Sequence, residues 1–163
     1  MLDIDLKNTN IIFSNKTYQK HLKEIENFEK ERYFCRHDLS HFLDVARIFT
    51  ILIQREKLDI KFDIIYSAAL LHDIGRALEY KDGISHDLAS IQIAKELLKE
   101  TSFTKEEIKI IISLIENHRN KTYTNSLESL FYKADKLSRE CFNCKAIGLC
   151  KWSDEKKNLK IKI

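Results

Sequence analysis

Apolar residues recur every three or four positions through most of the chain, the spacing that places them on one face of an α-helix. This spacing predicts six main helices, at about residues 16–33, 40–52, 62–73, 86–97, 104–118 and 127–140. A loop is expected from Gly75 to Ile84, where Asp82-Gly83 is a turn signal. Two terminal segments, 2–6 and 159–163, instead alternate apolar and charged residues, so they either pair as short strands or stay frayed.

Composition points to the same fold class. The 163 residues include no proline and only three glycines, so few residues interrupt helices. We therefore predict an all-α protein. Its length suits one domain with a single sizeable core.

Charge and hydropathy limit the partners that we expect. The net charge is only +3 and the lysines are dispersed, whereas nucleic-acid binding favours a clustered basic face. No stretch approaches the ~18 consecutive apolar residues of a membrane span. The first six residues lack the basic and apolar regions of a signal peptide. We expect a cytoplasmic protein, without nucleic-acid or membrane partners, whose thiols are reduced or bind metal.

Six residues able to bind a metal fall at or beside the apolar faces of the predicted helices. They are His41, His72, Asp73, His86, His118 and Asp135. A buried carboxylate without a partner costs several kcal/mol, which a salt bridge or a metal ion offsets. One such histidine is most often a hydrogen-bonded core residue, but six ligand-type residues on five successive helices favour a metal site.

The ligand types indicate which metals fit. Imidazole and carboxylate groups suit iron, manganese, nickel, cobalt and zinc. Two adjacent residues, His72 and Asp73, do not share one narrow helix face, but at a helix end both reach a common point. An aspartate in that place can bridge two ions.

The order of these residues resembles the HD-domain superfamily of metal-dependent phosphohydrolases. Three flanking segments match as well: Ser-His-Phe-Leu-Asp-Val-Ala at 40–46, Leu-Leu-His-Asp-Ile-Gly-Arg at 70–76 and Ala-Asp-Lys-Leu at 134–137. The resemblance covers about residues 35–140 and implies an all-α bundle. We take this range as the core of a single domain spanning 1–163, with a cysteine-containing tail, 141–163, packed on it.

The resemblance also implies roles for the ligands. His41, His72, Asp73 and Asp135 would hold a first ion, and His86 and His118 a second one bridged by Asp73. If only one ion binds, His86 and His118 would contact substrate phosphate instead.

The implied reaction is attack of metal-activated water on phosphorus, with a nucleotide or similar small phosphate compound as the substrate. Asp73 and Arg76 are the expected catalytic residues, since the planar guanidinium of Arg76 can bind phosphate. For Arg76 a surface role is equally open. Arg119 and Lys121 are weaker candidates for the phosphate, because an exposed cation is the simpler interpretation of both. The oligomeric state stays open, with a homodimer as the one assembly considered.

Four cysteines form a second candidate site. Cys141, Cys144 and Cys150 have the spacing Cys-x2-Cys-x5-Cys, and Cys35 lies far away in sequence. Cys35 precedes His41 by six residues and Cys141 follows Asp135 by six. If these two helices are antiparallel, all four thiols converge. Structural zinc, an iron–sulfur cluster and free packed thiols all remain open.

Three rivals to the hydrolase are kept. Some HD-fold enzymes use a similar set of four histidines and two aspartates as di-iron oxygenases, which predicts oxygen consumption. A non-catalytic sensor of nucleotide or metal predicts binding without turnover. A plain helical bundle with buried histidines predicts no bound metal.

Overall fold

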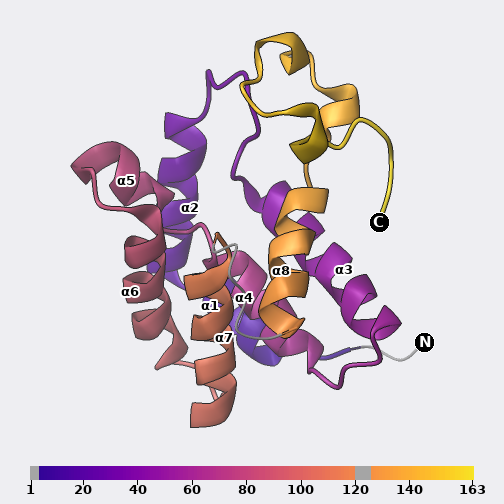
Figure 1. The fold of residues 1–163 in the computed structure, drawn as a ribbon. Helices are drawn as coiled ribbons and strands as arrows, with labels where there is room; N and C mark the ends of the chain where they lie inside the picture. Colours follow the sequence, from indigo (N-terminus) through magenta and orange to yellow (C-terminus); the bar gives the residue numbers. More distant parts are fainter. Residues whose placement is uncertain (1–3, 120–125) are drawn as a thin grey trace.

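The computed structural model describes residues 4–119 and 126–163, and within these ranges it contains α-helices and short 3-10 turns but no β-strand (Figure 1). The α-helices are α1 (Lys7–Ser14), α2 (Lys16–Phe28), α3 (Leu39–Arg55), α4 (Phe62–Leu71), α5 (Arg76–Asp82), α6 (His86–Leu98), α7 (Lys105–Asn117) and α8 (Ser126–Leu137). Three 3-10 turns follow: η1 (Cys141–Asn143), η2 (Ile147–Leu149) and η3 (Asp154–Lys156). The all-α prediction is confirmed.

Helix α4 is the centre of the bundle and packs against α1, α3, α6 and α7 (Figure 1). Seven of its ten residues are buried. A helix that is apolar on all sides has to be covered on all sides, which explains its central place. Since α4 ends just before His72, this packing fixes the position of the His-Asp pair.

Helices α3 and α8 lie side by side and run antiparallel (Figure 1). The rings of Phe49 and Phe131 meet edge to face between them, with centroids 5.1 Å apart. This packing brings the first turn of α3 beside the last turn of α8. His41 and Asp135 are therefore neighbours, although 94 positions separate them.

Two helices that the periodicity did not predict complete the fold. Helix α5 occupies most of the expected loop from Gly75 to Ile84, and Gly83 ends it with a left-handed φ of 69°. Helix α1 is held by a long-range contact, because the carboxylate of Asp63 accepts hydrogen bonds from the backbone N–H groups of Asn8 and Thr9 at 3.0 and 2.8 Å. The helix predicted at 16–33 stops at Phe28, and the one predicted at 127–140 stops at Leu137.

The helices predicted at 40–52 and 104–118 both begin with a side-chain cap. Asp38 accepts a hydrogen bond from the backbone N–H of His41 at 3.0 Å, and Thr104 and Glu107 form a capping box. The terminal strands are absent from the described residues, where 4–6 and 159–163 have no regular structure. None of the described helices has the length and apolarity needed to cross a membrane.

Candidate metal centre

The structure places the six predicted ligands at helix ends that converge on one buried point. His41 lies in the first turn of α3, and His86 is the first residue of α6. His72 and Asp73 follow α4, His118 follows α7, and Asp135 lies in the last turn of α8. All are buried except His41, which is partly covered.

Asp73 joins the ligands into two groups. The ligand atoms of His41, His72 and Asp73 all lie within 4.8 Å of one another, as do those of Asp73, His86 and His118. One carboxylate oxygen, Oδ2, lies 3.5 Å from His72 Nε2. The other, Oδ1, lies 3.3 Å from His86 Nε2 and 3.5 Å from His118 Nε2. Each oxygen of one carboxylate thus faces a different imidazole set.

Asp135 completes the first group. Its Oδ1 lies 3.5 Å from His41 Nε2 and 3.9 Å from His72 Nε2. The first group therefore has two imidazoles and two carboxylates, while the second has two imidazoles and the shared Asp73.

Contacts on the far side of each ring turn Nε2 toward the centre. His72 Nδ1 lies 2.7 Å from the carbonyl oxygen of Ala69, and His118 Nδ1 lies 2.5 Å from that of Ile115. His86 Nδ1 lies 2.9 Å from the carboxylate of Glu79. In each case the acceptor requires the proton on Nδ1, which leaves the Nε2 lone pair available for a metal.

The ring of His41 is oriented in the same way, by a hydroxyl group in place of a carbonyl or carboxylate oxygen. Its Nδ1 lies 3.1 Å from Ser138 Oγ, and that hydroxyl donates its own proton to the backbone oxygen of Asp135 at 2.7 Å. The hydroxyl can therefore accept from His41. Since Ser138 follows α8 directly, the end of this helix orients a ligand on α3.

The donor atoms that face the centre are buried without hydrogen-bond partners among the described residues. They are Nε2 of His41, His72 and His86, and Oδ1 of Asp73 and Asp135. Leaving so many polar atoms unpaired is costly, and divalent cations would satisfy all of them at once. The residues present therefore fit one or two transition-metal ions.

The protonation states agree with ligand chemistry. Burial lowers the pKa of His41 to about 3 and that of His72 to about 4. Burial alone would raise the pKa of Asp73, but the nearby His72 and Arg76 hold it well below the usual value. For Asp135, Lys136 and His72 likewise outweigh burial and lower the pKa. At neutral pH these are neutral imidazoles and charged carboxylates, the forms that bind metals.

A buried pair beside this centre was not anticipated from the sequence. Glu29 accepts a hydrogen bond from the backbone N–H of His37 at 2.6 Å, and its other oxygen lies 2.6 Å from His37 Nδ1. His37 Nε2 then faces Asp73 Oδ2 at 3.7 Å. Tyr80 also donates a hydrogen bond to Glu29, at 2.6 Å. His37 therefore points at the centre as the ligand histidines do.

The predicted phosphate-binding residues differ in their placement. Arg76 begins α5, and its Nε lies 3.3 Å from Asp73 Oδ2 with the side chain 17% exposed. Arg119 is more remote, since it is 54% exposed and its guanidinium lies 3.3 Å from Asp87 Oδ2. Asp87 is itself 3.0 Å from His86 Nε2. Lys121 lies outside the described residues.

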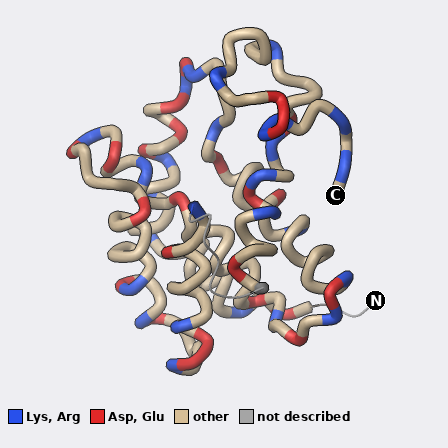
Figure 2. The backbone as a smooth tube through the Cα atoms, in the orientation of Figure 1, with Lys and Arg blue, Asp and Glu red and all other residues tan. Residues whose placement is uncertain are grey.

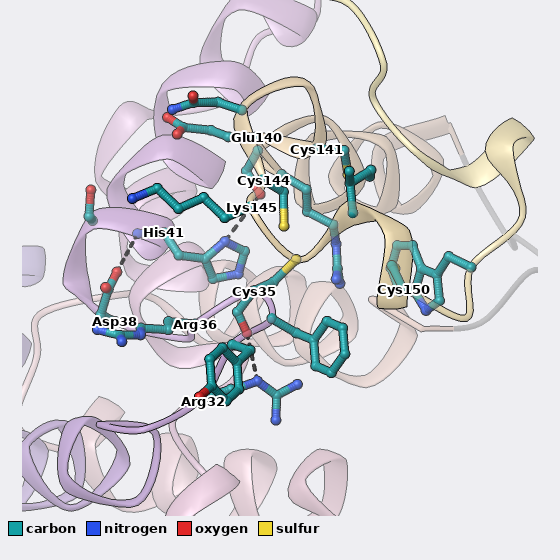
Figure 3. Close-up of a pocket in the computed structure, with 18 of the residues that line it drawn as sticks. Arg32, Cys35, Arg36, Asp38, His41, Glu140, Cys141, Cys144, Lys145 and Cys150 are labelled. Carbon is teal, nitrogen blue, oxygen red and sulfur yellow. Dashed lines mark hydrogen bonds between the residues drawn. The ribbon is translucent and has the colours of Figure 1, made fainter.

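The four cysteines line one cavity of about 720 Å³, with Cys35 on one wall and Cys141, Cys144 and Cys150 on the other (Figure 3). All four are free thiols. No three metal-binding side chains in the described residues that include a cysteine have their ligand atoms within 4.8 Å of one another. The antiparallel packing of α3 and α8 thus places the four cysteines around one cavity, but it does not bring three of their sulfur atoms within 4.8 Å of one another.

Comparison with known proteins gives a match to the HD domain model over residues 38–140. An uncharacterized protein of Clostridium beijerinckii is 47% identical over 152 residues, which cover 93% of this chain and 96% of that protein.

Two more distant similarities were found. Ribonuclease Y of Mycoplasma mycoides is 31% identical over 101 residues, but these cover 61% of this chain and only 18% of that protein. The crystal structure of a predicted HD superfamily hydrolase from an uncultured Thermotogales bacterium has a TM-score of 0.63. It is 21% identical, with 93% of this chain and 79% of that one covered, and therefore shows the shared fold.

Proposed function

Because the chain belongs to the HD-domain family, we propose that it is a metal-dependent phosphohydrolase with two divalent transition-metal ions. The observation that supports this most directly is Asp73, which belongs to both ligand groups and presents a separate oxygen to each. Bound ions of this kind lower the pKa of water and neutralise charge on phosphoryl oxygens.

The residues around the proposed ion sites suggest which side chains bind the phosphoryl group and accept the proton. Arg76 lies beside Asp73 and is held by Glu79, whose carboxylate oxygen Oε2 is 3.5 Å from Nη1 of the arginine. A guanidinium in that position can bind two oxygens of a phosphoryl group at once and orient it. In this proposal Arg76 also stabilises the charge that develops on those oxygens.

His37 is the proposed proton acceptor. Its Nε2 faces the oxygen of Asp73 that belongs to the first ligand group, so it lies where the attacking water would be oriented. Glu29 fixes the ring through Nδ1 and would stabilise the imidazolium that forms. Glu29 is suited to this because its hydrogen bonds with His37 and Tyr80 outweigh burial and keep its pKa low, at about 2.

A small phosphate compound, such as a nucleotide, is the proposed substrate class. In the part of the chain that the structure describes, positions of Lys and Arg are interspersed with those of Asp and Glu along most of the backbone (Figure 2). This favours a small substrate over a long nucleic acid, which needs many phosphate contacts. The similarity to Ribonuclease Y makes an RNA phosphodiester the second candidate.

The test is a release assay on the manganese-loaded or ferrous-loaded protein. Nucleoside mono-, di- and triphosphates, dinucleoside polyphosphates and a short single-stranded RNA would be compared. The proposal expects phosphate or nucleotide release from a small substrate and its loss in Asp73→Asn, with Asp59→Asn, an exposed aspartate, as the control. Oxygen consumption by the ferrous protein without any phosphate release would instead support a di-iron oxygenase.

A further inference from the structure

The C-terminal segment after α8 is not explained by hydrophobic packing. The cluster of buried core residues runs from Ile12 to Ala134 and includes none from 141–163. Within that segment only Cys141 and Ala146 are buried apolar residues, whereas Phe142 is 45% and Leu149 74% exposed. Segments without an apolar core usually depend on a metal or a covalent link for a fixed structure.

Two 3-10 turns position the cysteines of this segment. Cys141 begins η1 and Cys144 follows its last residue, with the Cys144 N–H donating to the Cys141 carbonyl at 3.2 Å. Because a 3-10 helix has three residues per turn, side chains three apart project in the same direction. Cys150 follows η2 through the same type of bond, from its N–H to the Ile147 carbonyl at 3.2 Å.

The fourth cysteine faces them from the connection between α2 and α3. The carbonyl oxygen of Cys35 accepts a hydrogen bond from Arg32 Nε at 2.8 Å, and Arg36 donates to the carbonyl oxygen of Lys30 at 3.0 Å. These contacts hold the connection against the end of α2. The sulfur atoms of Cys35 and Cys144 point toward one another across the cavity (Figure 3).

The charge of the cavity suits a dianionic group. Five cationic side chains line it: Arg32, Arg36, Arg139, Lys145 and Lys151. Three acidic ones, Asp38, Asp44 and Glu140, also line it, which leaves an excess of two positive charges. Four thiolates around a doubly positive centre carry a net charge of about −2, which the excess of cationic side chains around the cavity offsets.

The separation of the thiols distinguishes a cluster from a single ion. Tetrahedral zinc holds its sulfurs about 2.3 Å away, hence about 3.8 Å from one another. The described cysteines do not form a group of three with ligand atoms within 4.8 Å, so their thiols lie farther apart than one tetrahedral ion would hold them. We propose that Cys35, Cys141, Cys144 and Cys150 ligate a [4Fe–4S] cluster, which fastens the C-terminal segment to the α2–α3 connection.

This second site would adjoin the His/Asp centre. His41 and Ser138 line the cysteine cavity, and their side chains contact each other at 3.1 Å. Arg139 lies 3.9 Å from Asp135 Oδ2 and stacks on Trp152, with 4.1 Å from its guanidinium carbon to the ring. In this proposal the cluster therefore fixes the segment after α8, in which Ser138 orients the ligand His41 and Arg139 contacts the ligand Asp135.

The test measures iron and acid-labile sulfide in the full chain, purified without oxygen and reconstituted with sulfide and equal amounts of ferrous and ferric iron. Sulfide is the decisive quantity because a His/Asp centre contains none. We expect about four sulfides per chain, and visible absorption that is bleached by dithionite. Cys144→Ser and Cys35→Ser should each lose most of the sulfide, whereas Asp73→Asn should keep it.

Measurements on the parent protein alone can overturn the proposal, so the test does not depend on whether the variants fold. Absence of sulfide from the reconstituted parent would do so, as would one zinc per chain that Cys144→Ser loses and Asp73→Asn keeps. Titration of only two thiols in the denatured, unreduced parent would show a disulfide and have the same effect. Circular dichroism and manganese binding of the two cysteine variants report whether their His/Asp centre is intact.

Discussion

The carboxylate of Glu29 holds His37 at two points, the backbone N–H and the imidazole Nδ1, each at 2.6 Å. Both side chains are almost completely buried, with 2% and 3% exposure. The pair links the end of α2 to the break before α3, and it directs Nε2 of His37 at Asp73. A charged carboxylate is kept in the interior here, beside the centre that the ligand residues form.

Replacing Glu29 by Gln tests the role of this pair. The amide keeps the shape but loses the charge that would stabilise protonated His37, so we expect kcat to fall about 10-fold or more. Manganese content should stay at the parent level, because Glu29 does not face the ligand atoms. The control is Glu26→Gln, an exposed change on the same helix. Equal kcat values for parent and Glu29→Gln would remove His37 from the mechanism.

The phosphate contact proposed for Arg76 is tested by Arg76→Lys. Lysine keeps the positive charge but loses the planar pair of donors, so kcat/KM should fall about 10- to 100-fold. The loss should appear in both constants, as a higher KM from the weaker contact with the bound substrate and a lower kcat from the charge left unstabilised in the transition state. Arg47→Lys, at a side chain that is 59% exposed, is the matched control. If Arg76→Lys has the kcat and KM of the parent, Arg76 does not bind the substrate and serves only as an ion-pair partner of Asp73.

Gly75 permits the close approach of α6 to the His-Asp pair. A Cβ there would lie 2.4 Å from the backbone nitrogen of Ser90 and 2.6 Å from the backbone oxygen of His86. Gly75→Ala should therefore destabilise the protein by about 1–3 kcal/mol and displace His86. Urea unfolding and manganese titration measure the two effects. Gly148→Ala, where the Cβ meets nothing within 4 Å, should change neither.

The lowered pKa values of His41 and His72 predict how stability depends on pH. Burial brings them to about 3 and about 4 from 6.5, so the unfolded chain binds more protons than the folded one below pH 6.5. The metal-free protein should lose stability as the pH falls through this range. His86 acts in the same sense, whereas His118 acts in the opposite one, because Asp73 outweighs burial and raises its pKa.

Urea unfolding in the presence of a chelator measures this effect. With about 1.4 kcal/mol for each pKa unit, His41 and His72 each contribute a loss of roughly 2–3 kcal/mol between about pH 7 and about pH 4.5, which His118 partly offsets. Saturating manganese should raise the stability at both pH values without reducing the loss, because the ion excludes protons from the folded imidazoles and leaves their uptake by the unfolded chain unchanged. If the metal-free protein has the same free energy of unfolding at both pH values, the imidazoles of His41 and His72 are not buried as described.

The sequence alone predicted the helices that have a long apolar stripe, and it also identified the polar ligand residues that lie within such a stripe. His72, His86 and His118 stand out because an imidazole on an apolar face is conspicuous in a 3.6-residue pattern. The short helices were missed for physical reasons. Helix α5 has seven residues and one buried position, Ala77, and α1 is held by hydrogen bonds to Asp63 rather than by a strong stripe.

Contacts that cross a break in the chain could not be predicted in this way. His37 lies in a segment without helical periodicity, so neither its burial nor its contact with Glu29 follows from spacing. One signal was available: His37 precedes the ligand His41 by four positions. The gathering of the cysteines did follow from the antiparallel helices, whereas the size of the space between them required the structure.

Manganese binding per chain tests the central proposal, two ions that share Asp73, most directly. Equilibrium dialysis of the parent should give two tightly bound ions, about one in His86→Asn and in Asp135→Asn, and none in Asp73→Asn. Asp59→Asn, an exposed change, should match the parent. If a folded Asp73→Asn variant binds as much manganese as the parent, the bridging site and the mechanism built on it are both wrong.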